Sequence, residues 1–180
     1  MDLERFEDAL FAFLDDDGTF PNSVLPVYVL PGALARGRGG FAGEFERLFA
    51  DNGWPPAWRD GIFGYHHYHS TAHEGLGVAR GSIRVLLGGD GGIEVSARPG
   101  DCIVIPAGVA HKRLDTSADL LIVGAYPGGT SPDMLYGKPG ERPAADRRIA
   151  AVPLPSQDPV RGREGPLARL WLSPPPRRRD

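Results

Sequence analysis

The feature that most constrains the fold is a series of short apolar runs between residues 62 and 126. These runs are rich in Val, Ile, Leu and Tyr, and glycines separate one from the next. They predict strands at 62–69, 74–80, 82–88, 92–97, 101–105, 110–115 and 119–126, with GGDGG at 88–92 as a hairpin connection. Many short strands at even spacing are typical of an antiparallel sandwich or barrel. The sequence therefore predicts a mainly β fold.

The N-terminal part has a different pattern. Residues 2–16 carry Leu3, Phe6, Leu10, Phe13 and Leu14 at helical spacing, which predicts a first short helix. Asp2 could cap this helix and Gly18 could end it.

Two more elements are expected before residue 61. The stretch VLPVYVL at 24–30 predicts a strand, and its early proline suits the edge of a sheet. A second helical stripe begins at Phe41 and stops at Gly53. The following NGWPPAWRDG, at 52–61, predicts a connection broken by prolines.

The chain has 180 residues, enough for one domain with a substantial core. Residues 1–60 are expected to supply two helices and an edge strand, 61–126 the β core, and 127–180 a segment that wraps it. Pieces such as RRIAAVPLP at 147–155 belong to that segment. The run Arg177–Arg179 predicts a solvated, poorly ordered tail.

Charge and cysteine content exclude several classes of protein. The net charge is −3, so no basic footprint for nucleic acid is present. Cys102 is the only cysteine and excludes an intramolecular disulfide. No apolar stretch approaches the roughly 20 residues that span a bilayer, and the acidic start MDLERFEDAL lacks a signal-peptide pattern. We expect a cytoplasmic protein with neither membrane nor nucleic-acid partners.

Four of the five histidines lie in YHHYHSTAHEG at 65–75. Side chains of a strand alternate between its faces, so His67 and His69 share one face and His66 lies on the other. Glu74 follows a short turn, and a turn at PAGVA would bring His111 back to the same interior. Three imidazoles and one carboxylate suit a divalent Fe, Mn, Ni, Cu or Zn ion.

Two motifs in this region resemble the signatures of the cupin superfamily. Gly61, His67, His69, Glu74 and Gly81 match the first, G-x5-H-x-H-x4-E-x6-G, at every spacing. The second, G-x5-P-x-G-x2-H-x3-N, is matched by Gly100, Pro106, Gly108 and His111, with Asp115 in place of the asparagine. The flanks VGAYPGG and DPVRGREGPL make the chain most similar to the YjlB-like bacterial cupins.

The resemblance implies a single small cupin barrel, a jelly roll, with one divalent transition metal inside it. Carried over position by position, the ligands are His67, His69, Glu74 and His111. His66 and His73 match no ligand position, and Asp115 puts only local hydrogen bonding in doubt.

Two side chains are candidates for the substrate pocket. Tyr65 shares the parity of the ligand histidines, and is read either as a core residue or as a hydrogen-bond partner of a substrate. Arg113 shares the parity of His111. It would clamp a carboxylate or phosphate if it points inward, whereas a strand that twists or ends early would leave it on the rim.

The ligand set favours a metal-dependent enzyme, of oxygenase or isomerase type, that acts on a small polar metabolite. A module that binds a small molecule or a metal without turnover is the alternative, and a structural or storage role is least favoured. Cupins commonly form dimers, so the resemblance implies a homodimer, in which the strand at 24–30 could pair across subunits.

Overall fold

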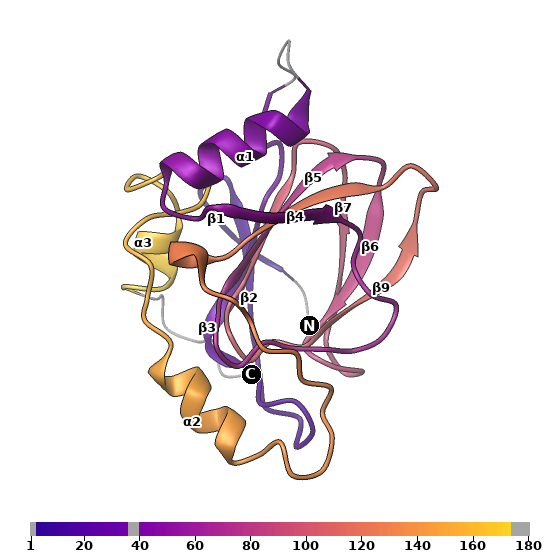
Figure 1. The fold of residues 1–180 in the computed structure, drawn as a ribbon, viewed down its shortest axis with the longest axis vertical. Helices are drawn as coiled ribbons and strands as arrows, with labels where there is room; N and C mark the ends of the chain where they lie inside the picture. Colours follow the sequence, from indigo (N-terminus) through magenta and orange to yellow (C-terminus); the bar gives the residue numbers. More distant parts are fainter. Residues whose placement is uncertain (1–2, 36–39, 174–180) are drawn as a thin grey trace.

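Two β-sheets form the body of the protein in a computed structural model that describes residues 3–35 and 40–173 (Figure 1). Within these residues the strands are β1 Glu4–Phe6, β2 Ala9–Leu14, β3 Ser23–Leu30, β4 Pro56–Asp60, β5 Glu74–Arg80, β6 Ile83–Leu87, β7 Ile93–Ala97, β8 Cys102–Ile105, β9 His111–Thr116 and β10 Leu121–Ala125. The helices are α1 Phe41–Asp51, the short 3-10 helix η1 Pro127–Gly129, α2 Ala144–Ala151 and α3 Leu167–Leu170. The predicted mainly β fold is confirmed.

The larger sheet has the order β1-β2-β3-β8-β5-β10-β4, and the smaller has the order β7-β6-β9. Their facing sides enclose an aliphatic core to which β2, β3, β5, β6, β7, β8 and β10 contribute. In β7 the residues alternate strictly, with Ile93, Val95 and Ala97 buried and Glu94 and Ser96 exposed. Such alternation is expected of a strand with one face on the core and one in water.

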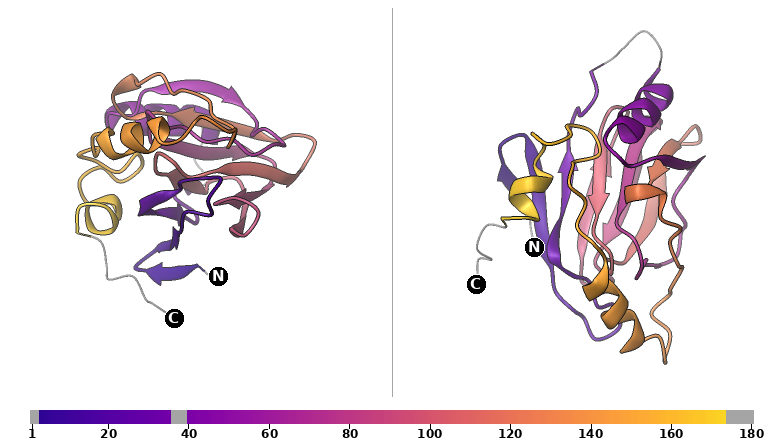
Figure 2. Two further views of the ribbon diagram at one scale, coloured as in Figure 1. Left: turned by 90° about the horizontal axis from the view of Figure 1, so that it is seen from below. Right: turned by 60° about the vertical axis from the view of Figure 1, so that its left-hand side comes forward.

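The outer side of the larger sheet is covered as well. Phe45 and Phe49 of α1, together with Leu167 and Leu170 of α3, pack in a second cluster with residues of β3 and β8. Figure 2 shows both helices beside this sheet. Strand β8, residues 102–105, is therefore buried on both faces, which explains its uninterrupted apolar sequence.

The helix predicted at 2–16 is wrong. Residues 4–6 and 9–14 form the hairpin β1–β2, in which Phe6 pairs with Ala9. The buried positions of β2 do not alternate, because residues on both of its faces are covered. Alternation was the signal that would have indicated a strand, and its loss left only the helical spacing. Asp2, the expected cap, lies outside the described residues.

Two predictions around prolines are also wrong. Strand β3 is no edge strand, since it lies between β2 and β8. Pro26 is tolerated because its position falls beyond the residues paired with β8 and at a register irregularity on the β2 side. The stretch at 52–61 is more than a connection, because Pro56–Asp60 forms β4 at an edge of the larger sheet.

Other expectations are confirmed. The second helix is α1, and β5 to β10 occupy the positions predicted at 74–80, 82–88, 92–97, 101–105, 110–115 and 119–126. GGDGG connects the antiparallel pair β6 and β7. In the part of the chain that the structure describes, no helix is both long and apolar enough to span a membrane.

The C-terminal segment crosses the covered face of the larger sheet. The Trp171 Nε1–H donates to the Pro26 carbonyl at 2.9 Å. The Tyr28 hydroxyl donates to Asp158 Oδ2 at 2.6 Å, and Asp158 Oδ1 accepts the N–H groups of Val160 and Arg161. This buried carboxylate thus orders its own loop and attaches the segment to β3. The expected tail at 177–179 lies outside the described residues.

We expect Tyr28→Phe to lower the free energy of unfolding by about 1–3 kcal/mol, because it leaves Asp158 Oδ2 buried without its donor. Urea denaturation measures the change. Tyr136→Phe removes the same atom from an exposed side chain and is the control. Equal stability of the two variants would contradict a structural role for this hydrogen bond.

Candidate metal centre

A backbone bridge between His67 and His111 joins the two halves of the site. The His111 N–H donates to the His67 carbonyl at 2.9 Å, and the His67 N–H donates back at 3.2 Å. This is an isolated bridge, so the strand predicted at 62–69 is wrong as a regular element. The segment still runs antiparallel to β9, since the Arg113 N–H donates to the Phe63 carbonyl at 2.8 Å.

The three imidazoles converge in the interior. His67, His69 and His111 are buried, and one potential ligand atom from each lies within 4.8 Å of the others. Glu74, the first residue of β5, joins them: its Oε2 lies 3.3 Å from His111 Nε2 and 3.7 Å from His69 Nε2. The structure therefore brings together all four residues that the sequence nominated.

The Nδ1 atom of each of these three imidazoles contacts a backbone carbonyl. His67 Nδ1 lies 3.2 Å from the Tyr65 oxygen, and His111 Nδ1 lies 3.2 Å from the Val109 oxygen. His69 Nδ1 lies 2.5 Å from the Asp133 oxygen. Because a carbonyl only accepts, each Nδ1 carries a proton, and in the neutral ring Nε2 offers a lone pair. This is the orientation that metal-binding histidines adopt.

The two oxygens of Glu74 have different surroundings. Oε1 accepts a 2.8 Å hydrogen bond from the Tyr126 hydroxyl, which in turn accepts one from Trp58 Nε1–H at 2.9 Å. Oε2 is buried and accepts no geometrically acceptable hydrogen bond among the described residues. Tyr126 thus leaves Oε2 as the oxygen that faces the imidazoles.

The pKa values follow from burial and mutual proximity. Burial, assisted by the charge of His111, lowers the pKa of His67 to about 3. For His69, burial lowers the pKa, but the nearby negative charge of Glu74 and the Asp133 carbonyl outweigh it, so the pKa lies above its usual value. For Glu74, burial raises the pKa, but His111 and His69 outweigh it and hold it well below its usual range. A carboxylate and a neutral His67 are thus both favoured at neutral pH.

One of the separations between Glu74 and the imidazoles fits a divalent ion directly, and the 3.7 Å separation from His69 Nε2 is longer. Nitrogen and oxygen ligands about 2.1 Å from an ion are about 3.0 to 3.4 Å apart at octahedral or tetrahedral angles. The separation between Glu74 Oε2 and His111 Nε2 is 3.3 Å. Three imidazoles and one carboxylate, all buried, form a borderline ligand set for a transition metal.

Asp133 holds the His69 side of the site and was missed by the sequence analysis. Its carboxylate accepts hydrogen bonds from the Ser70 N–H at 2.6 Å, from the Ser70 hydroxyl, and from the Thr71 hydroxyl at 3.2 Å. Arg148 lies 3.5 Å from the same carboxylate. Through these contacts Asp133 places its own carbonyl against His69. Tyr126 and Trp58 were missed too, because no sequence pattern links them to Glu74.

His66 and His73 lie apart from the three convergent imidazoles. His66 Nε2 is 2.9 Å from Asp90, whose side chain is exposed. His73 is buried, and its Nδ1 accepts the Ala107 N–H at 3.0 Å, while its ring packs on Trp171 at 4.7 Å. Burial lowers the pKa of His73 to about 4. Neither residue lines the cavity at the convergent imidazoles.

A cavity of about 240 Å³ opens beside the four candidate ligands. Its wall also includes Trp58, Asp60, Gly61, Ile62, Phe63, Leu76, Tyr126, Pro132 and Met134. Tyr65 is 48 % exposed and stacks on Phe63 with ring centroids 4.9 Å apart, so it lies at the mouth and not in the core. Arg113 is exposed and outside the cavity lining. Its guanidinium lies beside Gly64. Of the two alternatives for Arg113, inward or on the rim, this position corresponds to the rim.

Backbone geometry explains two motif glycines. Gly81 has a φ of 70°, and a Cβ there would lie 2.3 Å from Ser117 Oγ and 2.8 Å from Leu120 Cα. Gly108 has a φ of 95°, and its Cβ would lie 2.2 Å from the Asn22 carbonyl oxygen. Only glycine fits such positions without strain. Asp115, the motif departure, is exposed and accepts a hydrogen bond from the Thr116 N–H.

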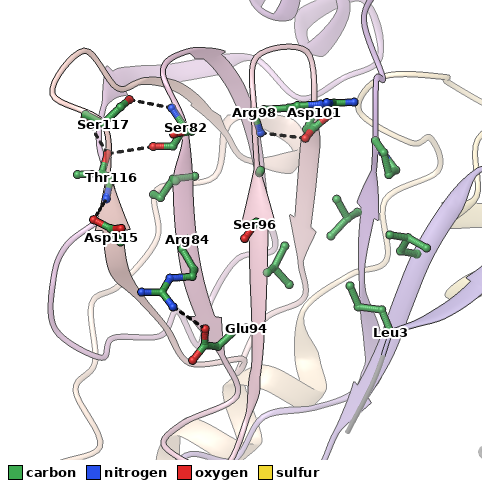
Figure 3. Close-up of a pocket in the computed structure, with 16 residues that line it drawn as sticks. Leu3, Ser82, Arg84, Glu94, Ser96, Arg98, Asp101, Asp115, Thr116 and Ser117 are labelled. Carbon is green, nitrogen blue, oxygen red and sulfur yellow. Dashed lines mark hydrogen bonds and ion pairs between the residues drawn. The ribbon is translucent and has the colours of Figure 1, made fainter.

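A larger groove of about 790 Å³ lies elsewhere, against β6, β7 and the end of β9 (Figure 3). Its labelled polar groups pair with one another: Arg84 with Glu94, and the Arg98 N–H with Asp101. No histidine lines it. The convergent donors of the described chain thus lie at the smaller cavity.

The chain is similar to a protein of nearly the same extent. No family model matches the chain. It is 41 % identical over 161 residues to the uncharacterised protein YjlB of Bacillus subtilis (strain 168), a match that covers 89 % of this chain and 94 % of that protein.

Two solved structures are similar at a lower level. A DUF861 family protein from Thermotoga maritima is 17 % identical, with a TM-score of 0.33, over 54 % of this chain and 96 % of that one. The acireductone dioxygenase from Bacillus anthracis, with a cadmium ion in its active centre, is 18 % identical, with a TM-score of 0.38, over 72 % and 84 % of the two chains.

We expect Tyr126→Phe to weaken Ni²⁺ binding by about tenfold or more, because Glu74 loses the donor that orients its carboxylate. Isothermal titration calorimetry measures the affinity. Tyr68→Phe is a matched control, since the buried Tyr68 also donates to a glutamate, Glu141, which is outside the cavity. Equal losses in the two variants would argue against a positioning role for Tyr126.

The raised pKa of His69 predicts opposite effects of pH on stability and on metal affinity. Protonated His69 stabilises the metal-free protein below the unfolded pKa, and this contribution disappears as the pH rises through the folded value. Metal must displace that proton, so affinity increases over the same range. Thermal unfolding of the metal-free protein, measured in a chelator, should show that the melting temperature falls more for wild type than for Glu74→Gln as the pH rises from 6 to 9. Parallel curves would rule out this coupling.

Proposed function

We propose that this chain, which belongs to the YjlB family of the cupin superfamily, is a metal-dependent enzyme for a small polar metabolite. In this proposal one divalent transition metal is held by His67, His69, Glu74 and His111, between two sheets that would correspond to the cupin barrel. The observation that carries it is Glu74 Oε2, a buried anionic oxygen without an acceptable hydrogen bond that faces imidazole lone pairs. A cation at this point would satisfy all four groups.

The ion and the cavity wall would have different roles in the reaction. Such an ion, when bound, acts as a Lewis acid that polarises a ligand oxygen. Phe63, Leu76 and Met134 supply an apolar wall that limits water. Burial, then the charge of Glu74, raises the pKa of Tyr126 far above its usual value, so its hydroxyl stays a donor to Glu74.

Oxygenase-type and isomerase-type reactions remain the two candidates. Asp60 lines the cavity and is, besides the proposed ligands, the one carboxylate of the described lining residues. It is the candidate proton acceptor that an isomerase needs. An oxygenase would instead consume O₂ with its substrate, so turnover under nitrogen distinguishes the two classes.

Binding without turnover is the alternative function. It is favoured by the small number of titratable groups in the described lining, since Tyr126 is committed to Glu74 and only Asp60 remains. A module of this kind would be stabilised by its ligand and would return it unchanged.

A homodimer and a cytoplasmic location complete the proposal. Strand β3 cannot pair across subunits, because β2 and β8 occupy both of its edges. In the described structure β7 pairs with β6 alone, which leaves the edge of Ile93–Ala97 for a second copy. Light scattering during gel filtration measures the mass.

The cytoplasmic assignment rests on Cys102, a lone buried thiol.

The decisive experiment is elemental analysis of protein purified without a histidine tag. We expect about one equivalent of a transition metal in wild type and loss of that metal in His67→Ala/His111→Ala, because two of four ligands are removed. His66→Ala makes the same change at a histidine outside the site and should retain the metal. Stoichiometric metal in the double variant would refute the ligand assignment.

A further inference from the structure

Exposed apolar side chains gather at the mouth of the cavity. Four of the large hydrophobic residues exposed in the described chain form this mouth patch: Phe63, Tyr65, Met134 and Tyr136. Phe63 and Met134 also line the cavity. The Tyr65 ring is stacked on Phe63 at an interplanar angle of 14°, and its centroid lies 5.9 Å from that of Tyr136. The patch is therefore continuous with the cavity wall.

The mouth patch adjoins the candidate metal ligands. The Tyr65 carbonyl accepts the Nδ1–H of His67, and the Tyr65 and His67 ring centroids are 5.9 Å apart. Asp133, next to Met134, supplies the carbonyl for His69. Contiguous exposed apolar surface beside a cavity marks a binding surface more often than chance exposure does. Here the same backbone holds both the patch and the imidazoles.

The size of the cavity limits what can lie inside it. Its 240 Å³ is below the usual range of about 300–1,000 Å³ for ligand pockets. A small head group with oxygen donors fits beside Glu74, whereas any larger portion must leave through the mouth. There it meets Phe63 and Tyr65, whose flat rings favour offset stacking with another ring.

Charge argues against a phosphate as the recognised group. No lysine or arginine is among the cavity's lining residues, and Asp60 adds a negative charge. Arg113, the expected anion clamp, lies outside that lining. A compact chelating head group on a flat apolar body matches these surroundings better than a multiply charged one.

We propose that the mouth patch binds the aromatic portion of a ligand whose paired oxygen donors occupy the cavity. This substrate class, an aromatic compound with an adjacent chelating group, rests on the proposed metal site. Tyr65 acts as a specificity residue that selects the body of the ligand, and the cavity accepts its head.

The test compares two hydroxamates with the same chelating head on the Co²⁺-loaded protein, by calorimetry and by the visible spectrum of the ion. Benzohydroxamic acid should bind wild type about three- to tenfold more tightly than acetohydroxamic acid, as one stacking contact predicts. Tyr65→Ala should abolish that preference, and Tyr65→Phe, which retains the ring, should restore it. Co²⁺ affinity should stay within about twofold of wild type in both variants, since both retain the backbone carbonyl that accepts the His67 Nδ1–H.

Leu154→Ala is the matched control, because Leu154 is 45 % exposed and outside the patch. It should preserve the preference. Equal affinity of wild type for the two hydroxamates, or a preference that survives Tyr65→Ala, would overturn the inference while leaving Co²⁺ binding intact. Failure of wild type to bind Co²⁺ would refute the proposed function itself. A change of oligomeric state in Tyr65→Ala with unaltered preference would assign the patch to an interface between copies.

Discussion

The arrangement of the site depends on one buried carboxylate. Glu74 is 3 % exposed, and moving a carboxylate out of water is tolerated only where positive charge or donors replace its hydration. Tyr126 satisfies Oε1, but Oε2 faces His69 and His111 with no better partner than these imidazoles. The fold therefore maintains an anionic oxygen that a proton on His69 satisfies in part and that a divalent ion would satisfy more fully.

The groups around the Glu74 carboxylate are positioned by segments that lie far apart in the sequence. The bridge between His67 and His111 fixes one pair of candidate ligands, and Glu74 enters from β5 in the larger sheet. Asp133 belongs to the segment after η1, yet it orders residues 70 and 71 and orients His69. Loss of any of these contacts would displace a candidate ligand without removing it, which is why positioning residues are expected to affect metal affinity strongly.

The sequence predicted the candidate ligands because their spacing is local. His67, His69 and Glu74 lie within eight positions, and one turn places His111. The second helix and the strands after residue 73 were also predictable, since their periodicity is regular. The hairpin at 4–14 was not, because burial of both faces of β2 removed the alternation that marks a strand.

Contacts formed only in the folded chain were beyond the sequence. Tyr126 and Trp58 are 68 positions apart, and Asp133 is 63 from Ser70. Nothing in their local pattern distinguishes them from ordinary aromatic or loop residues. The position of Arg113 likewise depends on the register between 62–69 and β9, which places its guanidinium beside Gly64.

The tautomers separate the candidate ligand histidines from the buried bystander. His67, His69 and His111 each direct Nδ1 to a carbonyl, so the proton is fixed there and Nε2 is free to bind. His73 is equally buried, but its Nδ1 accepts the Ala107 N–H, so in the neutral ring Nε2 carries the proton. An imidazole in that state presents a hydrogen and not a lone pair on its outer nitrogen. Burial alone would have grouped His73 with the other three, whereas the backbone partner of each ring assigns them to different roles.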